Sequence, residues 1–148
     1  LFHWMEISWV ALAALAAAWP AAAGDFRSVA EPAVLYDAPS AKAKQLFIIH
    51  RRTPVEVVVA IEGWAKIRDA DGTLAWIDKR ALSEQRTLLV RADRAQIRAD
   101  ANEKADLVFE AERQVALDLV ELGPAGWAKV RHRDGQQGFI RLTQTWGG

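Results

Sequence analysis

The sequence predicts an all-β protein made of two small β-barrels in tandem, preceded by an N-terminal signal peptide. The first observation is a repeat, because "WAKIRDADGTLAWI" at 64–77 returns as "WAKVRHRDGQQGFI" at 127–140 with seven identities in 14 positions. The second is a series of short apolar segments at roughly ten-residue spacing, separated by Gly and Asp turns, which is typical of small barrels. The third is that no stretch after residue 24 shows sustained helical periodicity.

The N-terminal segment resembles an export signal. Residues 7–19 form an apolar run, and Ala21–Ala23 supplies the small residues of a cleavage site, which predicts a signal peptide over 1–23. No Lys or Arg precedes the run, and the chain begins with Leu1, so the basic start is expected upstream or the start is misassigned. The alternative is an uncleaved membrane anchor, although the run is shorter than the roughly 20 residues that span a bilayer. Either interpretation predicts a periplasmic or secreted folded part, with membrane contact only if the segment is retained.

The repeat divides the remaining chain into two units, predicted as domains at 24–86 and 87–148. In the first unit we expect apolar strands at 44–50 and 53–61, the latter with alternating valines from Val55 through Val57 to Val59. A turn at Glu62–Gly63, a strand from Trp64, an Asp71–Gly72 turn and a strand at 74–78 complete it. The second unit runs the same way, with Gly123–Pro124 and Asp134–Gly135 as its turns.

Composition excludes several classes of protein. The 148 residues include 19 basic and 19 acidic ones, so the net charge is zero. Sequence-independent nucleic-acid binding needs a basic surface, and we therefore expect no nucleic-acid partner. No cysteine is present, which excludes disulfides, thiolate metal sites and cysteine nucleophiles together.

Residue types that carry catalysis or metal binding lack their usual partners. His50 and His132 occupy unrelated places in the repeat, whereas a metal site or a general base needs partners at fixed spacing. The "DADG" segment at 69–72 lacks the later acidic ligands of a calcium loop, and only its Asp-Gly is shared with the second copy, which indicates a turn. No serine lies in a G-x-S-x-G context and no phosphate loop exists. We therefore predict no enzyme activity, no cofactor and no metal.

These motifs resemble a known family. "AVLYDAPS" at 33–40, an apolar strand, and "EGWAKIRDADGTLAWI" at 62–77 resemble the bacterial SH3-like domain. The second copy resembles it more closely, with Arg98 in its opening motif and Gly138 before the aromatic residue. The resemblance implies two SH3-like barrels, each with a ligand groove near the repeated phrase. It also implies a role in the cell envelope, since such domains often bind peptidoglycan, frequently its peptide part, and accompany wall hydrolases.

Strand alternation separates the side chains of the repeat into two faces. Ile67 and Ile77 are apolar in both copies, so they are predicted to point into the core, and their neighbours along the strand must face outward. If the strands pair around Asp71–Gly72, Arg68 falls near Trp76. Aromatic and basic side chains on one face can hold a peptide by stacking, cation–π contact and carboxylate pairing. The candidate ligand-binding residues are Trp64, Lys66, Arg68, Trp76, Trp127, Lys129, Arg131 and Phe139.

Other interpretations of these outward residues stay open. Lys and Arg stems commonly cover aromatic rings on small barrels, and the two copies can also pack on each other through these faces. Tyr36 and Arg98, in the opening motifs, are further candidates, and Trp146 is predicted to close the second barrel. Two functions follow: a non-catalytic envelope protein that recognises peptidoglycan or its stem peptides, or a protein–protein adaptor or subunit of an envelope complex.

Overall fold

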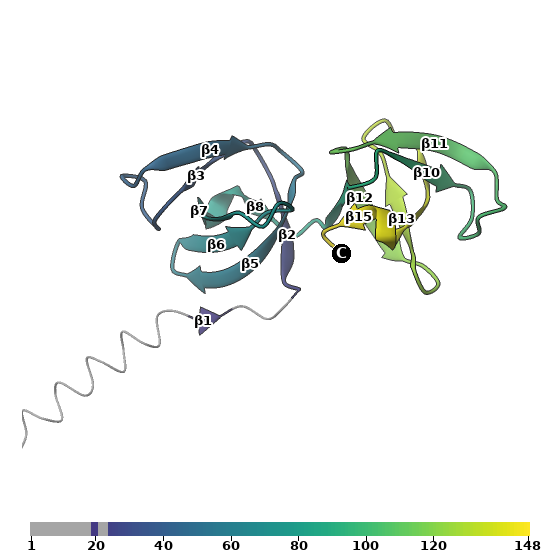
Figure 1. Ribbon diagram of the computed structural model, residues 1–148. Helices are drawn as coiled ribbons and strands as arrows, with labels where there is room; N and C mark the ends of the chain where they lie inside the picture. The colour runs from purple at the N-terminus through teal and green to yellow at the C-terminus, as the bar shows by residue number, and fades with distance from the viewer. Residues whose placement is uncertain (1–18, 21–23) are drawn as a thin grey trace, which may run out of the picture.

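The computed structural model describes residues 19–20 and 24–148, and there the chain forms two curled β-sheets that lie side by side (Figure 1). Two single-turn 3₁₀ segments, η1 (Lys79–Ala81) and η2 (Leu142–Gln144), interrupt the strands. The predicted all-β fold with two units in tandem is confirmed. We call the unit built from β2–β8 the first module and the unit built from β9–β15 the second module. No helix in the described residues is long and apolar enough to cross a membrane.

The strands of the first module are β2 (Phe26–Val29), β3 (Ala33–Tyr36), β4 (Gln45–Ile49), β5 (Pro54–Ile61), β6 (Trp64–Arg68), β7 (Leu74–Asp78) and β8 (Leu82–Ser83). Those of the second are β9 (Thr87–Val90), β10 (Arg94–Arg98), β11 (Leu107–Glu112), β12 (Ala116–Leu122), β13 (Trp127–Arg131), β14 (Gln137–Arg141) and β15 (Thr145–Trp146). The strand order is β4-β3-β7-β6-β5-β2-β8 in one sheet and β11-β10-β14-β13-β12-β9-β15 in the other. The two orders match strand for strand, so the repeat in the sequence is a repeat in the fold.

The predicted signal peptide lies almost wholly outside the described residues. Of positions 1–23, the structure describes only β1 (Trp19–Pro20), which pairs antiparallel with β5 opposite Val59 and Ala60. Cleavage of this segment therefore stays a prediction.

Each module has its own apolar core, and the predicted inward residues form it. Ile67 and Ile77 are fully buried, and so are their counterparts Val130 and Ile140 in the second module. The alanines of the repeat share that phase of the strand and are buried with them, as strand alternation requires. Leu35 of β3 completes the first core, and the second core holds the equivalent Ile97.

A β-bulge changes the phase of β5, so the expected alternation of its valines ends before Val59. Val55 and Val57 are buried, but the register with β6 shifts between Val57 and Val59. Val59 therefore lies opposite Lys66 on the outer side, and Ala60 takes the inward position against the core.

The turn between β6 and β7 is built by Asp69. Its carboxylate oxygen Oδ1 accepts the backbone N–H groups of Asp71 and Thr73, each at 2.9 Å, and Gly72 has a φ of +86°. These hydrogen bonds occupy the carboxylate locally, as expected for a turn.

A three-residue segment, 84–86, connects the modules, and both of its sides are held. The hydroxyl of Ser28 donates to the carbonyl of Gln85 at 2.6 Å, and that of Thr87 donates to the carbonyl of Arg52 at 2.7 Å.

We predicted that Trp146 closes the second barrel. Its ring also packs against Phe26 of the first module, edge to face, with centroids 5.2 Å apart. The domain boundary predicted at 86/87 stays a prediction.

Candidate functional site

The outer face of the first module brings three aromatic rings together around a lysine. On this face Lys66 of β6 lies opposite Trp76 of β7, and Trp76 lies opposite Tyr36 of β3. Tyr36 also contacts Trp64, with ring centroids 5.5 Å apart and an interplanar angle of 84°, the edge-to-face geometry that aromatic pairs favour. All four side chains are half-buried, so part of each ring meets solvent. We call Tyr36, Trp64, Lys66 and Trp76 the aromatic face.

Arg68 does not belong to this group, and the prediction that it lies near Trp76 is wrong. Arg68 lies opposite Leu74, and its guanidinium pairs with the Glu56 carboxylate at 2.6 Å across the neighbouring strand. The prediction assumed a two-residue turn, whereas the hydrogen bonds to Asp69 create a longer loop that moves the register by one residue.

Sequence reasoning gave Tyr36 less weight than the repeated phrase, and the sheet shows why it belongs to the face. β3 and β7 are far apart in sequence but neighbours in the sheet, and Tyr36 and Trp76 are their paired residues. The only signal in the sequence was the position of Tyr36 in the opening motif, where the second copy has Arg98.

The second module carries the equivalent positions, but its tryptophan is covered. Trp127 is only 7% exposed, and the guanidinium carbon of Arg141 lies 4.6 Å from its ring centroid, a cation–π contact. Arg141 lies directly opposite Trp127 across the β13–β14 pair, and Glu103 holds its guanidinium by an ion pair. The first module has Asp78 at the position of Arg141, and Asp78 cannot stack on Trp64 in this way.

The remaining predicted residues of the second module have their own contacts. Phe139 lies between Lys129 and Arg98 in the sheet, in the row equivalent to Lys66, Trp76 and Tyr36. Arg131 lies 3.7 Å from the carboxylate of Asp118. The structure therefore gathers Trp127, Lys129 and Phe139 on one side of the sheet, with Arg131 engaged by an acid at the end of the strand.

Charge at the rim of the aromatic face is fixed by a local pair. Asp78 caps the 3₁₀ turn η1, and hydrogen bonds from the side chain and backbone of Arg80 hold the pKa of its carboxyl below 3.8. The same pair raises the pKa of Arg80. In the second module, the backbone N–H of Gln136 lowers the pKa of Asp134 in the β13–β14 turn.

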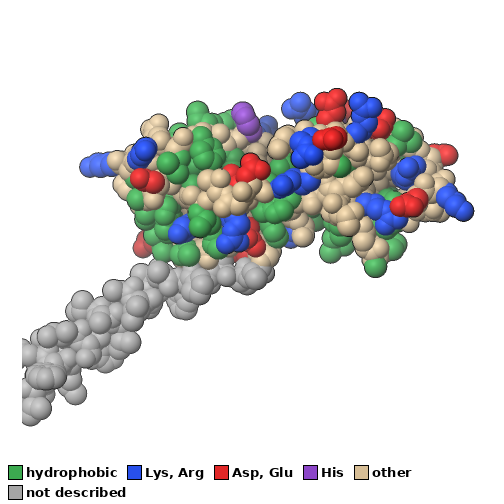
Figure 2. All heavy atoms as spheres, viewed as in Figure 1, with side chains coloured by type: hydrophobic (Ala, Val, Ile, Leu, Met, Phe, Trp, Pro, Cys, Tyr) green, Lys and Arg blue, Asp and Glu red, His purple; other side chains and the backbone are tan. Residues whose placement is uncertain are grey.

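Packing of the two modules through their outer faces was one open interpretation, and the observed contacts between the modules lie elsewhere. The contacts between modules include the Phe26–Trp146 ring pair, the Arg52–Asp118 ion pair and hydrogen bonds from Thr87 to Arg52 and from Arg91 to Ala70. None of these residues is a predicted ligand-binding residue. The aromatic face is therefore left uncovered by the second module. Over the side shown in Figure 2, hydrophobic side chains are denser on the first module and charged ones on the second.

The family model of the bacterial SH3 domain matches the chain twice, over residues 29–84 and 91–147. The chain therefore belongs to the bacterial SH3 domain family, as a tandem pair, and the resemblance read from its motifs is confirmed. Bacterial SH3 domains are typically non-catalytic binding modules, and they occur in secreted or envelope proteins.

Solved structures with a similar arrangement are NlpC/P60-type proteins. NlpC2 from Trichomonas vaginalis is 12% identical with a TM-score of 0.37, over 82% of this chain and 47% of that one. An NlpC/P60 family protein from Bacillus cereus is 15% identical with a TM-score of 0.38, over 82% and 55%. An NlpC/P60 endopeptidase from Photobacterium damselae subsp. piscicida is 14% identical with a TM-score of 0.35, over 84% and 33%. The chain thus spans from a third to about half of the length of these proteins. No curated protein matches the sequence.

Proposed function

We propose that this chain is a non-catalytic binding protein of the bacterial cell envelope that recognises peptidoglycan through its stem peptides. The observation that carries the proposal is the aromatic face, where the rings of Tyr36, Trp64 and Trp76 stay partly exposed around Lys66. Family membership supports it, since bacterial SH3 domains are typically binding modules. The predicted export signal supports a periplasmic or secreted location.

The chemistry of the face suits a short peptide with carboxylates. Ring faces offer stacking for peptide planes and aliphatic side chains, and a lysine ammonium among rings can pair with a carboxylate in a partly desolvated setting. The first module is proposed as the principal binder, because the guanidinium of Arg141 covers the ring of Trp127 in the second module. Lys129, Arg131 and Phe139 are then secondary contacts, and Trp127 takes part only when Arg141 moves away.

Sedimentation with purified peptidoglycan sacculi tests the proposal. Wild type is expected to pellet with the sacculi, and Trp76→Ala is expected to weaken binding about tenfold or more, the loss typical of a central aromatic anchor. Phe139→Ala, at the equivalent position of the second module, is the matched control and should bind within about threefold of wild type. Thermal unfolding of both variants confirms that they are folded.

The outcomes separate the parts of the proposal. A wild-type protein that stays in the supernatant rules out wall binding. Equal losses from Trp76→Ala and Phe139→Ala would instead rule out the leading role of the first module. The double variant Trp64→Ala with Trp127→Ala should release a folded protein, whereas unfolding would show that these two rings serve only the structure.

A second candidate function is a protein–protein adaptor, and the edge strand β4 favours it. β4 is the last strand of its sheet, and its side chains Leu46, Phe47 and Ile48 are 39%, 42% and 63% exposed. An open apolar edge can accept a strand from a partner protein. Ile48→Lys should abolish capture of such a partner from envelope extract while leaving sacculus binding unchanged. Loss of sacculus binding in that variant would contradict the separation of the two surfaces.

A further inference from the structure

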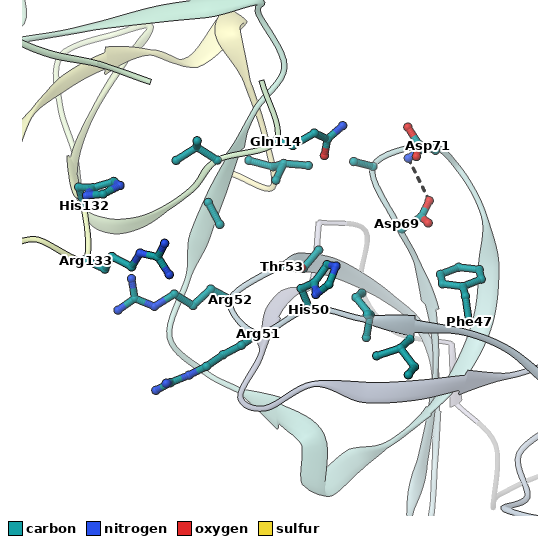
Figure 3. Close-up of a pocket in the computed structure, with 16 residues that line it drawn as sticks. Phe47, His50, Arg51, Arg52, Thr53, Asp69, Asp71, Gln114, His132 and Arg133 are labelled. Atoms are coloured by element: carbon teal, nitrogen blue, oxygen red, sulfur yellow. Dashed lines mark hydrogen bonds between the residues drawn. The ribbon is translucent and has the colours of Figure 1, made fainter. Parts of the chain in front are cut away.

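The two modules enclose a cleft that is distinct from both outer faces. The cleft has a volume of about 650 Å³ and is lined from both sides. The first module contributes the end of β4, the following turn at 50–53 and the loop at 69–71, and the second contributes Leu89, the turn at 114–116 and His132–Arg133. Figure 3 shows these side chains converging from the two modules.

Positive charge gathers at one end of this cleft. In Figure 3 the guanidinium groups of Arg51, Arg52 and Arg133 extend to the same side, and those of Arg52 and Arg133 point toward one another from opposite modules. The two acidic lining residues, Asp69 and Asp71, lie at the other end of the cleft, and one oxygen of Asp69 is occupied by its own turn. The arginine end is therefore not neutralised by the acids that line the cleft.

The carboxylate that pairs with Arg52 is shared with a second arginine. Asp118, which is 9% exposed, lies 3.5 Å from Arg52 and 3.7 Å from Arg131. Within residues 24–148, neither Arg51 nor Arg133 forms an ion pair or a side-chain hydrogen bond. The Nη1 atom of Arg52 is buried and has no hydrogen-bond partner in the described structure. This buried atom does not face the cleft, and the part of the Arg52 side chain open to a ligand is the remaining 32% that is exposed.

The backbone of Arg52 is held by hydrogen bonds to both modules. Arg52 has a φ of +70°, in the left-handed region that a non-glycine residue rarely adopts. Its N–H donates to the carbonyl of Val29 at 2.7 Å, and its carbonyl accepts from Thr87. These contacts hold the backbone of Arg52 at the cleft, and the Asp118 carboxylate, 3.5 Å away, orients its guanidinium.

We propose that the arginine end of this cleft binds an oxyanion, a carboxylate or phosphate group of a small ligand or of a polymer end. Guanidinium groups match both groups by paired N–H···O bonds, and an anion between Arg52 and Arg133 replaces their mutual repulsion by attraction. The site needs both modules, since Arg51 and Arg52 come from one and Arg133 from the other. The site shares no residue with the aromatic face, so its test is independent of the test of wall binding.

Titration calorimetry of the chain at low ionic strength, with pyrophosphate and with citrate as probes, tests the site. Saturable binding that weakens with salt is expected, and the tighter of the two probes identifies phosphate or carboxylate as the preferred group. The double variant Arg51→Gln with Arg133→Gln should bind at least about tenfold more weakly, because charge-assisted hydrogen bonds are lost. Arg52 is left intact because it also connects the modules.

Matched variants keep the test specific. Arg94→Gln with Lys104→Gln removes two exposed positive charges away from the cleft and should change affinity by less than about threefold. Arg51→Lys with Arg133→Lys keeps the charge but loses the paired geometry, so an intermediate affinity is expected. The NMR signals of the Arg52 guanidinium N–H groups should shift on addition of the tighter probe.

Two results would overturn the proposal. One is the absence of saturable binding of either probe to the wild-type protein. The other is an equal loss of affinity in the Arg94/Lys104 variant, which would show a general charge effect. The Arg51→Lys with Arg133→Lys variant keeps two positive charges on long side chains, so it is expected to fold like wild type. A lower affinity in this variant therefore reports the loss of paired hydrogen bonds and not the loss of folding.

Discussion

Substitution of Gly138 by alanine is expected to destabilise the second module through a single methyl group. A Cβ at this position would lie 2.5 Å from Cγ2 of Ile97 and 2.6 Å from the carbonyl oxygen of Arg98. Carbon atoms in contact lie about 3.5–4.0 Å apart, so β10 would have to move by about 1 Å. Because the oxygen of Arg98 belongs to the backbone, no change of side-chain rotamer relieves the clash.

Overpacking of this kind costs about 1–3 kcal/mol, which at this chain size lowers the unfolding midpoint by roughly 4–12 °C. Urea unfolding followed by tryptophan fluorescence, together with calorimetry, measures both quantities. Gln137→Ala, on the exposed side of the same strand, is the control and should change stability by less than about 0.5 kcal/mol. A Gly138→Ala variant as stable as this control would refute the close approach of β10 to β14.

The equivalent position of the first module gives the opposite experiment. Ala75 is 2% exposed and lies opposite Ile67, as Gly138 lies opposite Val130. Here the methyl group is already accommodated, so Ala75→Gly should cost about 1–2 kcal/mol through lost burial and added chain flexibility. Gly138→Ala and Ala75→Gly are therefore both expected to destabilise, because the first module accommodates a Cβ at this position and the second has no room for one.

Three further predictions concern the connection between the modules and its charges. Trp146→Ala removes the ring that packs on Phe26 and should speed trypsin cleavage within 84–86 about tenfold, measured by mass spectrometry, whereas wild type should resist. Asp118→Asn deprives two guanidinium groups of their shared carboxylate and should cost about 1–2 kcal/mol in urea unfolding at low salt, less at high salt. The Asp78 carboxyl should titrate below 3.8 by NMR. Because the folded pKa lies below the unfolded value of 3.8, the stabilising contribution of this carboxylate is fully present above pH 3.8. It is lost as the pH falls from there through the folded pKa, and Asp78→Asn should remove this part of the acid dependence.

The inward half of the repeat was predictable from sequence because strand alternation is a local rule. Ile67 and Ile77 are fully buried, as their recurrence in both copies indicated. Alternation failed where the backbone departs from a regular ladder. The bulge beside Val57 moves Val59 to the outer side, and the loop organised by Asp69 moves Arg68 away from Trp76. Both departures depend on hydrogen bonds that the identity of the residues alone does not specify.

Contacts between segments distant in the chain were beyond the reach of a repeat-based argument. Tyr36 joins the aromatic face because β3 is paired with β7. Phe26 meets Trp146 although neither residue has an aromatic equivalent in the other copy. The difference between the outer faces depends on Arg141 where the first copy has Asp78. This exchange is visible in the sequence, but the stacking of Arg141 on Trp127 is not. A comparison of the two copies identifies the residues that they have in common. The contacts of Tyr36, Phe26, Trp146 and Arg141 involve residues that differ between the copies.

The short, hydrogen-bonded connection at 84–86 has a consequence for how a repetitive ligand is recognised. Since Gln85 is held by Ser28, and Thr87 is held by Arg52, the outer faces of the two modules keep a set separation. A flexible tether would let two modules engage ligand groups over a wide range of distances, with an effective concentration that depends on tether length. Under the proposed wall binding, a rigid pair gains avidity only from a polymer whose repeat matches its own spacing, so the connection would make binding depend on the periodicity of the polymer.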